Sequence, residues 1–359
     1  QGVGFFNPNA IYPLTVKSSQ TGMVHFMIDD LENFDTNQPI YIHDTTNDSY
    51  HNIRISNLSI VIPAGEMHKQ QATVDFIIEA LLNFGANRQS VLIGVGGGVV
   101  TDMVGYVAGV FMRGVQFGFV PITLLAMVDA SVGGKNGINL GHHKNYIGTF
   151  QLPENIYVSP HWLGTLPQTE LLSGWAEVIK HGIIAGGKHF QQITKAIPSA
   201  KDQQTWLGLI EWNVKIKSRI VDTDFTETAE RKLLNLGHTI GHALESWSHD
   251  IGQPVSHGSA IAWGLLYETK LAIAIAENPE ETRVFQSALF TIVQSLYPRV
   301  PFGVKDIPAL LDYIRADKKN QSNALLFSLA FAPGKCQYNI EILPETVVQV
   351  LNKPIDDSH

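Results

Sequence analysis

Residues 90–102 read Ser90-Val-Leu-Ile-Gly-Val-Gly-Gly-Gly-Val-Val-Thr-Asp102, an apolar run followed by glycines and then a helical pattern. Such a run is typical of a buried strand, and the glycines let the backbone approach a phosphate where a helix N-terminus favours negative charge. The spacing differs from the dinucleotide fingerprint G-x-G-x-x-G, because its last glycine falls at Val99. The stretch therefore favours nucleotide or phosphate binding and leaves a purely structural turn open, with Asp102 either capping the helix or binding the ligand.

Outward from this stretch, the first part of the chain alternates short strands with helices. We expect strands at 39–43, 58–62, 90–94 and 117–121, and helices at 73–84 and from 101 to about 111. This alternation is the signal for parallel βαβ units. From about residue 160, longer helical segments follow, at 170–184, 205–221, 233–247, 258–277 and 281–295.

The pattern predicts two domains. Residues 1–160 are expected to form an α/β domain with a Rossmann-like parallel sheet, and residues 161–359 a mostly α-helical domain. A ligand site in the cleft between two such domains is the usual expectation.

Composition and charge narrow the class of protein. Of the 359 residues, 44% are hydrophobic and 16% charged, as in a globular protein with a large core. The formal net charge of -8 argues against a nucleic-acid or anionic-membrane surface, and the apolar stretch 114–128 is shorter than the roughly 20 residues of a membrane span. A single cysteine, Cys336, excludes a disulfide framework. With no secretory signal visible, we expect a cytoplasmic protein.

A second glycine-rich segment, residues 128–148, gathers polar side chains among its glycines: Asp129, Lys135, Asn139, Lys144 and Asn145. Lysines beside glycines suit a phosphate, because backbone and ammonium groups can converge on one anion. A surface loop with solvated lysines is the alternative interpretation.

Polar residues also recur at helical spacing in the second half. Glu177 and Lys180 stand three apart and share a helix face, either as a surface ion pair or as part of a site. A later segment carries four polar residues at spacings of four, three and four, which a single helix places in one stripe: Arg231, Asn235, His238 and His242. So many polar groups in register on an apolar helix are hard to explain as solvated surface.

Histidine and carboxylate side chains offer a metal site. Zinc commonly takes three such protein ligands and keeps one position open for water or substrate. Glu177, His238 and His257 could supply that set, although His238-Thr-Ile-Gly-His242 lacks the glutamate of the H-E-x-x-H motif.

Other basic residues carry weaker signals. Lys215 and Lys217 lie two apart on a predicted helix and point in different directions, so at most one of them faces a site. Arg113 follows an apolar helix, where it could be a simple C-terminal charge, and residues 317–320 read as a solvated turn.

Taken together, these motifs resemble the 3-dehydroquinate synthase family, within the wider group of sugar phosphate cyclases. The matching runs follow the family's order: 96–102, 106–114, 128–139, 144–145, 176–180, 233–242, 257–258 and 317–320. The resemblance implies a dehydroquinate synthase-like fold and conversion of 3-deoxy-D-arabino-heptulosonate 7-phosphate to 3-dehydroquinate with release of phosphate. It also implies catalytic use of NAD+, one Zn2+ (or Co2+), a homodimer, and no nucleic-acid or membrane partner.

The resemblance also implies roles for individual residues. The metal ligands would be Glu177, His238 and His257. The residues contacting substrate hydroxyls would be Asp129, Lys180 and Asn235. The phosphate would be held by Lys135, Asn145 and His242, with Arg113 reaching it from the partner subunit. The substrate carboxylate would be bound by Lys217 and Arg231, and the phosphate end would be closed over by Lys318 or Lys319. The NAD+ site would comprise Asp44, Glu66, Lys69, Gly97, Gly98, Asp102, Thr123 and Lys144.

Departures from the family's pattern occur at Ser259, where glutamate is usual after His-Gly, and at Ile122 and Asn136, where threonine is usual. One alternative function is a cyclase acting on sedoheptulose 7-phosphate or glucose 6-phosphate, whose substrates lack the carboxylate that Lys217 and Arg231 would bind. Others are a metal-dependent alcohol or glycerol dehydrogenase, which would accumulate NADH, and a non-catalytic relative, which should have lost a metal ligand.

Overall fold

The computed structural model describes residues 14–18, 22–26, 39–46, 58–141, 143–316, 324–353 and 355. By its internal contacts the chain forms two units: unit 1 comprises residues 1–171 and 198–222, and unit 2 comprises residues 172–197 and 223–359. Each unit thus includes a segment whose chain neighbours belong to the other.

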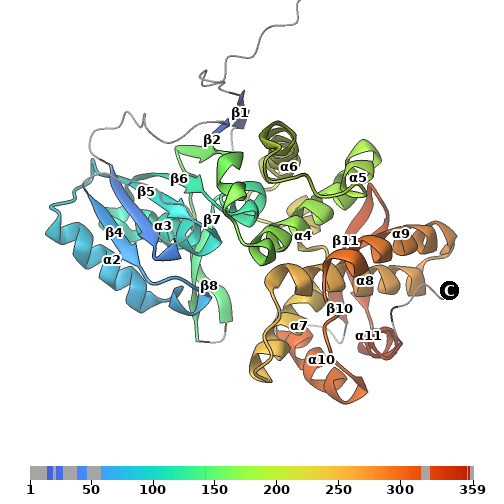
Figure 1. The fold of residues 1–359 in the computed structure, drawn as a ribbon. Coiled ribbons are helices and arrows are strands. Elements are labelled where there is room, and N and C mark those ends of the chain that lie inside the picture. The colour runs from blue at the N-terminus through green and yellow to red at the C-terminus, as the bar shows by residue number, and fades with distance from the viewer. Residues whose placement is uncertain are drawn as a thin grey trace, which may run out of the picture. The chain divides into compact units, whose positions relative to one another are not determined.

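Unit 1 is built on a seven-stranded sheet with the order β1-β2-β9-β6-β5-β3-β4 (Figure 1). The strands are β1 (Leu14–Ser18), β2 (Gly22–Phe26), β3 (Ile40–Asp44), β4 (Ser59–Ile62), β5 (Val91–Gly96), β6 (Gln116–Pro121) and β9 (Asn155–Val158). Strand β1 pairs antiparallel with β2, and the other neighbouring pairs are parallel. The predicted parallel sheet is confirmed, since each of the four strands expected from the apolar runs is present.

The helices of unit 1 follow from the same patterns. They are α2 (Gln71–Asn83), α3 (Gly98–Val110) and α6 (Gln203–Thr223), with shorter turns η1 (Glu66–His68), η2 (Phe111–Arg113), η3 (Ala126–Ala130) and η4 (Pro160–Gly164). In α2, Val74, Ile77 and Leu81 are fully buried at helical spacing. Gly85, at φ 72°, follows the end of α2 in the left-handed conformation that commonly terminates helices.

A β-hairpin occupies the second glycine-rich segment, where no strand was predicted. Strand β7 (Lys135–Leu140) pairs antiparallel with β8 (His143–Phe150). The buried Asn136 donates from Nδ2 to the carbonyls of Gly134, at 3.1 Å, and Gln151, at 2.8 Å. A Cβ at Gly105 of α3 would lie only 1.9 Å from Asn136 Oδ1. Helix α3 therefore lies in close contact with this hairpin at Gly105.

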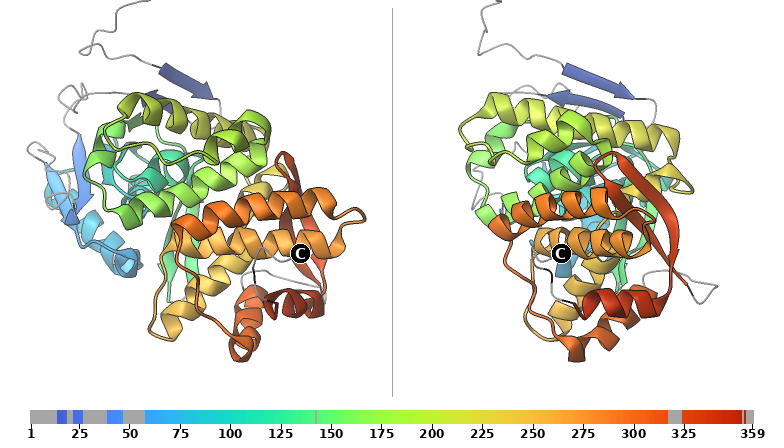
Figure 2. Two further views of the ribbon diagram at one scale, coloured as in Figure 1. Left: turned by 45° about the vertical axis from the view of Figure 1, so that its right-hand side comes forward. Right: turned by 90° about the vertical axis from the view of Figure 1, so that its right-hand side faces the viewer.

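Unit 2 is mostly helical, as predicted, and adds a second hairpin. Its helices are α4 (Gln168–Ala185, whose first residues count with unit 1), α5 (Gly187–Ile193), α7 (His238–Asp250), α8 (His257–Ile275), α9 (Glu280–Leu296), α10 (Ile307–Ala316) and α11 (Pro344–Leu351). The hairpin pairs β10 (Leu325–Ala332) with β11 (Lys335–Ile342), and the short turns are η5 (Glu230–Asn235) and η6 (Val304–Asp306). Figure 2 shows α9 running along the largely buried α8.

Among the described residues, no helix combines the length and apolar character that crossing a membrane requires.

The helix predicted over 233–247 is wrong at its start. Turn η5 ends at Asn235, Leu236 is not helical at ψ 127°, and Gly237 takes the left-handed conformation at φ 78° before α7 begins at His238. A Cβ at Gly237 would lie 2.6 Å from Leu265 Cγ, so the break needs glycine. The predicted single stripe is therefore divided: Arg231 and Asn235 lie on η5, while His238 and His242 share α7.

Candidate active site

The carboxyl ends of the parallel strands in unit 1 collect most of the residues expected to bind NAD+. Strand β3 has β4 on one side and β5 on the other, so the direction in which strands are added to the sheet reverses after β4. Ligands of open α/β sheets bind at the carboxyl ends beside such a reversal. The residues that end or follow these strands are Asp44 after β3, Glu66 and Lys69 after β4, Gly97, Gly98 and Asp102 after β5, and Thr123 after β6.

The glycines at the end of β5 have close neighbours. A Cβ at Gly96 would lie 2.5 Å from Val100 Cγ2, and one at Gly97 would lie 3.2 Å from Thr123 Cγ2. Gly97 is the N-cap of α3 and offers no side chain to bind the first amides of that helix. A helix N-terminus of this kind, bordered by bare backbone, suits a phosphate group.

A buried lysine ties this edge to the β7–β8 hairpin. Lys69 is 3% exposed, and its Nζ donates to Asp102 Oδ2 and to Asn145 Oδ1, each at 2.5 Å. Burial alone would lower the pKa of Lys69, but Asp102 and Glu66 raise it above its usual value, so the ammonium stays charged. The side chain of Asn139 connects the same residues, accepting from the Asn145 amide and donating to Glu66 Oε1, both at 2.8 Å.

This network connects residues that the sequence analysis assigned to two different ligands. Glu66, Lys69 and Asp102 were expected at the NAD+ site and Asn145 at the phosphate. Asn139, to which no role was assigned, connects them. Its position among the glycines of 128–148 was the available signal.

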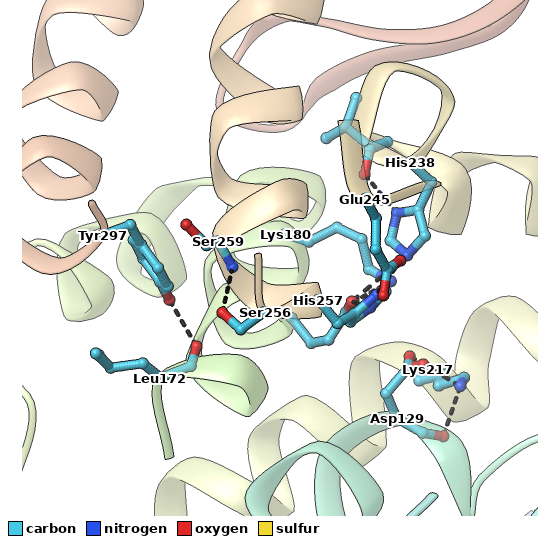
Figure 3. Close-up of polar contacts among 12 residues, drawn as sticks. Asp129, Leu172, Lys180, Lys217, His238, Glu245, Ser256, His257, Ser259 and Tyr297 are labelled. Atoms are coloured by element: carbon cyan, nitrogen blue, oxygen red, sulfur yellow. Dashed lines mark hydrogen bonds and ion pairs between the residues drawn. The ribbon is translucent and has the colours of Figure 1, made fainter. Parts of the chain in front are cut away.

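Helix α6 contributes Lys217 to unit 1. Lys217 Nζ lies 2.8 Å from Asp129 Oδ1 and donates to the Asp129 carbonyl at 2.6 Å (Figure 3). Its side chain is 8% exposed, whereas that of Lys215 is 54% exposed and pairs with Glu211. The two lysines therefore point in different directions, as predicted, and a place for Lys217 in a site stays a prediction.

Three other cations that were expected at the site lie at the surface of unit 1. Lys135, expected at the phosphate, and Lys144, expected at the NAD+ site, are exposed on the β7–β8 hairpin. Arg113 is exposed at the end of η2 with φ 68°, directly after Met112 with φ 49°. Two consecutive non-glycine residues in the left-handed region are uncommon, and such strain concentrates at functional sites. Lys318 and Lys319 lie outside the described residues.

Unit 2 brings together the three residues predicted as metal ligands. One ligand atom from each of Glu177, His238 and His257 lies within 4.8 Å of the others. The Nε2 atoms of His238 and His257 are each 3.4 Å from Glu177 Oε1. The three come from α4 and from the first residues of α7 and α8.

The other ring nitrogens of both histidines have partners. His238 Nδ1 lies 3.0 Å from the Leu236 carbonyl, and His257 Nδ1 lies 3.3 Å from Glu245 Oε2 (Figure 3). Histidines in metal sites commonly donate one ring N–H to a carbonyl or carboxylate, which leaves the other nitrogen for the ion. Glu245 was missed by sequence reasoning, although its place seven residues after His238 on α7 puts it two turns further along the same helix.

The charges within this group favour an ionised carboxylate. Burial alone would raise the pKa of Glu177, but the buried Lys180 beside it, together with His238, holds that pKa well below its usual value. Burial, aided by Lys180, lowers the pKa of His238 to about 4. Burial also acts to lower the pKa of His257, but hydrogen bonds to Glu177 and Glu245 raise it to about 10. The predicted Glu177–Lys180 pair is thus a buried one.

Close backbone packing sets the position of His257. A Cβ at Gly258 would lie 2.4 Å from Ser173 Cα, so the start of α8 rests directly on the backbone of α4. Ser256 caps α8 by accepting from the Ser259 amide at 3.3 Å (Figure 3). The contact at Ser173 lies about one turn before Glu177, which brings His257 to that carboxylate.

Arg231 is held by a tight loop in unit 2. It is 2% exposed, and its Nη1 donates to the Phe225 carbonyl at 2.5 Å. The carboxylate of Asp224 accepts from the amides of Thr228, Ala229 and Arg231 at 2.9, 2.7 and 3.0 Å. Asp224 was also missed, because an aspartate in a turn-rich segment has no distinctive pattern. Lys217 belongs to unit 1 and Arg231 to unit 2, so their pairing on one carboxylate stays a prediction.

Comparisons with known proteins agree with this arrangement. The family model described as 3-dehydroquinate synthase N-terminal matches residues 59–173, and that described as 3-dehydroquinate synthase C-terminal matches residues 174–320. The 3-dehydroquinate synthase of Pyrococcus abyssi is 39% identical over 298 residues, which cover 82% of this chain and 84% of that protein. That of Parabacteroides distasonis is 36% identical over 293 residues, covering 82% of each.

Two solved structures share the fold. A 2-deoxy-scyllo-inosose synthase, crystallised with carbaglucose-6-phosphate, NAD+ and Co2+, matches with a TM-score of 0.76 at 23% identity, over 92% of this chain and 96% of that chain. A 2-epi-5-epi-valiolone synthase from Streptomyces hygroscopicus, with NAD+ and Zn2+ bound, matches with a TM-score of 0.73 at 21% identity, over 91% and 95%.

The parallel sheet of unit 1 and the helices of unit 2 therefore have the fold of the sugar phosphate cyclases, and the 3-dehydroquinate synthase relatives show that the chain is an enzyme. Within that class, the chain belongs to the 3-dehydroquinate synthase family.

Substitution of Asp224 tests the loop that carries Arg231. Backbone donors from Thr228, Ala229 and Arg231 overcome the effect of burial and lower the pKa of Asp224 below its usual value. Its stabilising contribution is therefore present above the unfolded-state pKa of about 3.9 and is lost as the pH falls through the lower folded-state value. We expect Asp224→Asn to lower the free energy of unfolding by about 1–2 kcal/mol at neutral pH, measured by urea denaturation.

That difference should begin to shrink below about pH 4, where the carboxylate is protonated in the unfolded state, and should be lost once the pH falls below the lower pKa of the folded state. Asp312→Asn is the control, because the Asp312 side chain is 77% exposed and its pair with Arg315 is a surface one, so the change should alter stability by no more than about 0.5 kcal/mol. A difference between Asp224→Asn and wild type that stays constant across the pH range would contradict this account.

Proposed function

We propose that this chain catalyses the reaction for which its family is named, the conversion of 3-deoxy-D-arabino-heptulosonate 7-phosphate to 3-dehydroquinate and phosphate with no net oxidation. The observation that supports this most is the donor group of the buried Glu177 and the half-buried His238 and His257, present intact in a chain matched by both family models. The proposed substrate is a phosphorylated sugar acid, so the protein must bind an anion at each end of it.

The edge of unit 1 fits NAD+. No Cβ can be added at Gly96 without displacing Val100, and Gly97 leaves the N-terminus of α3 without a side-chain cap. We propose that the NAD+ pyrophosphate lies on this backbone, with the charged Lys69 held beside it by Asp102. Bound NAD+ supplies a hydride acceptor that is regenerated within each turnover, so NADH does not accumulate.

The donor group of unit 2 fits Zn2+ or Co2+. A carboxylate and two imidazoles, each imidazole with its other nitrogen on an oxygen, form the kind of set that catalytic zinc sites use. Glu177, His238 and His257 would hold the ion, which when bound supplies Lewis-acid polarisation of a substrate oxygen.

The residues around these groups would orient the substrate. Lys180 is buried against Glu177, and this ion pair holds its Nζ in one direction, while Asn235 would offer an amide to a hydroxyl. Asp129, fixed by Lys217, would accept from another hydroxyl. Holding these hydroxyls in one conformation favours a single path of elimination and ring closure.

Separate cations would bind the two ends of the substrate. We assign the phosphate to Lys135, Asn145 and His242, and the carboxylate to Lys217 and Arg231. The planar, always-charged guanidinium of Arg231 suits bidentate binding of a carboxylate. Lys217 and Arg231 are both buried although the protein has a net negative charge, which supports a role for them in binding an anionic group of the substrate.

We also propose a homodimer in which Arg113 reaches the phosphate of the partner subunit. The exposed side chain of Arg113 and the left-handed backbone at Met112 and Arg113 support a loop shaped for contact. Light scattering on the purified protein should give twice the chain mass of 39.6 kDa.

The decisive assay measures phosphate release from 3-deoxy-D-arabino-heptulosonate 7-phosphate in the presence of NAD+ and Zn2+, with identification of the product by mass and ultraviolet absorbance. Dehydroquinate and phosphate in equal amounts, without growth of NADH absorbance, support the proposal. Release only from sedoheptulose 7-phosphate or glucose 6-phosphate would replace it with another cyclase, and net NADH formation would replace it with a dehydrogenase.

Removing a metal donor should remove both metal and activity. Glu177→Gln and His238→Ala each take away one of the proposed ligands. Loss of a residue that only supports a metal ligand typically weakens metal binding about 10- to 100-fold. We expect each of these variants to weaken Zn2+ binding by more than that, as measured by competition with a chelator. Activity should fall in parallel, and a fully active variant without metal would refute the site.

Removing a carboxylate-binding cation should affect turnover and spare the metal. Lys217→Ala and Arg231→Ala are each expected to lower kcat/KM about 10- to 150-fold, the equivalent of one charged hydrogen bond, with unchanged Zn2+ content. Lys215→Ala is the matched control, because it removes the same charge from the same helix at an exposed position. Equal loss of metal and turnover in the Lys217 and Arg231 variants would count against the carboxylate role.

A further inference from the structure

The N-terminus of α7 is capped by a carboxylate from another helix. Glu268, on α8 and only 1% exposed, accepts from the Gly237 amide through Oε2 at 2.5 Å and from the Ile240 amide through Oε1 at 3.1 Å. The N-cap residue of α7 is Gly237, which has no side chain with which to satisfy these donors. A carboxylate is also the group that the positive end of a helix favours.

These two hydrogen bonds bracket His238. Gly237 precedes it and Ile240 follows two residues later, so the two oxygens of Glu268 accept hydrogen bonds from the backbone on either side of His238. The same bend turns the Leu236 carbonyl toward His238 Nδ1, at 3.0 Å. The direction of His238 Nε2 therefore depends on backbone that Glu268 holds.

Close packing leaves this backbone in direct contact with α8. A Cβ at Gly264 would lie 2.1 Å from the Gly237 carbonyl and 2.8 Å from the Gly241 amide. The first turn of α7 thus lies against α8 one turn before Glu268. Helix α8 also begins with His257. A single helix therefore carries one proposed ligand, His257, and binds the backbone around another, His238.

Packing alone does not require a charged residue at this position. A buried carboxylate is costly to desolvate, and apolar side chains of similar volume often stabilise a core equally well or better. What a carboxylate adds is two acceptors at fixed positions, which define the backbone conformation between residues 237 and 240.

We propose that Glu268 is a positioning residue for the metal centre, acting on His238 through the backbone of the first turn of α7. This inference rests on the proposed function, because it takes Glu177, His238 and His257 as ligands of a divalent ion. In this role Glu268 binds the backbone amides of Gly237 and Ile240 and fixes the angle at which the His238 ring presents Nε2.

The test measures Co2+ binding by the full-length protein, with and without substitution at position 268. Glu268→Gln keeps the shape but replaces one acceptor oxygen with an NH2 group, which cannot accept from a backbone amide. We expect Co2+ affinity to fall about 10- to 100-fold and the visible absorption bands of the bound Co2+ to shift, while circular dichroism stays unchanged. The band shift reports ligand geometry, which a loss of stability alone would not alter.

Glu268→Asp serves as a second variant should Glu268→Gln fail to fold. It keeps the charge, but its shorter side chain cannot reach both amides, so we expect the same band shift and a smaller loss of affinity. Thr269→Val is the matched control, because it removes a buried hydrogen bond from the same helix, that of Thr269 Oγ1 to the Leu265 carbonyl at 2.7 Å. It should leave the Co2+ affinity and spectrum as in wild type.

Wild-type affinity and spectrum in the folded Glu268 variants, with binding lost in His238→Ala, would overturn the role of Glu268 and leave the metal site standing. Failure of the wild-type protein itself to bind Co2+ would overturn the proposed metal site, and this inference with it. The two failures are thus distinguished by the wild-type measurement.

Discussion

Helix α8 lies against two other helices at distances that leave no room for a Cβ. Gly258 meets the backbone of α4, and Gly264 meets the backbone of α7 at Gly237 and Gly241. Because main chain touches main chain, the angles between these helices are set by atoms that cannot change rotamer. The three proposed metal ligands come from these three helices, so their separation depends first on these backbone contacts.

Unit 1 reaches a similar result by another route. Its strands place acidic, basic and bare backbone groups along one edge, and the buried ammonium of Lys69 then binds Asp102 and Asn145 together. A charged group with almost no exposure is stable only when its partners are fixed, so this network also fixes the hairpin that carries Lys135 and Lys144. In unit 2, contacts between backbones position the proposed metal ligands. In unit 1, the buried ammonium of Lys69 positions the hairpin that carries Lys135 and Lys144.

The sequence predicted what depends on local pattern and missed what depends on contacts distant in sequence. Apolar runs located β3 to β6, and periodicity located α2, α4 and α8, because each buries a face defined by a few neighbouring residues. The exposed strand β8 has little apolar alternation, so nothing in its composition set it apart from a loop. The break at Gly237 was missed because its cause lies in Leu265, almost thirty residues away.

The same division holds for the site. Glu177, His238 and His257 were found from residue type together with a family resemblance, and the structure places them in one group. Glu245, Asp224 and Glu268 were missed, since a carboxylate that supports a neighbour shows no motif of its own.

The order in which the chain forms the two units has a further consequence. Because α6 belongs to unit 1 yet follows the start of unit 2, a gene segment ending before it would encode a sheet without Lys217. The two units are thus interleaved in the coding sequence, and recombination at one crossover point cannot exchange either of them intact.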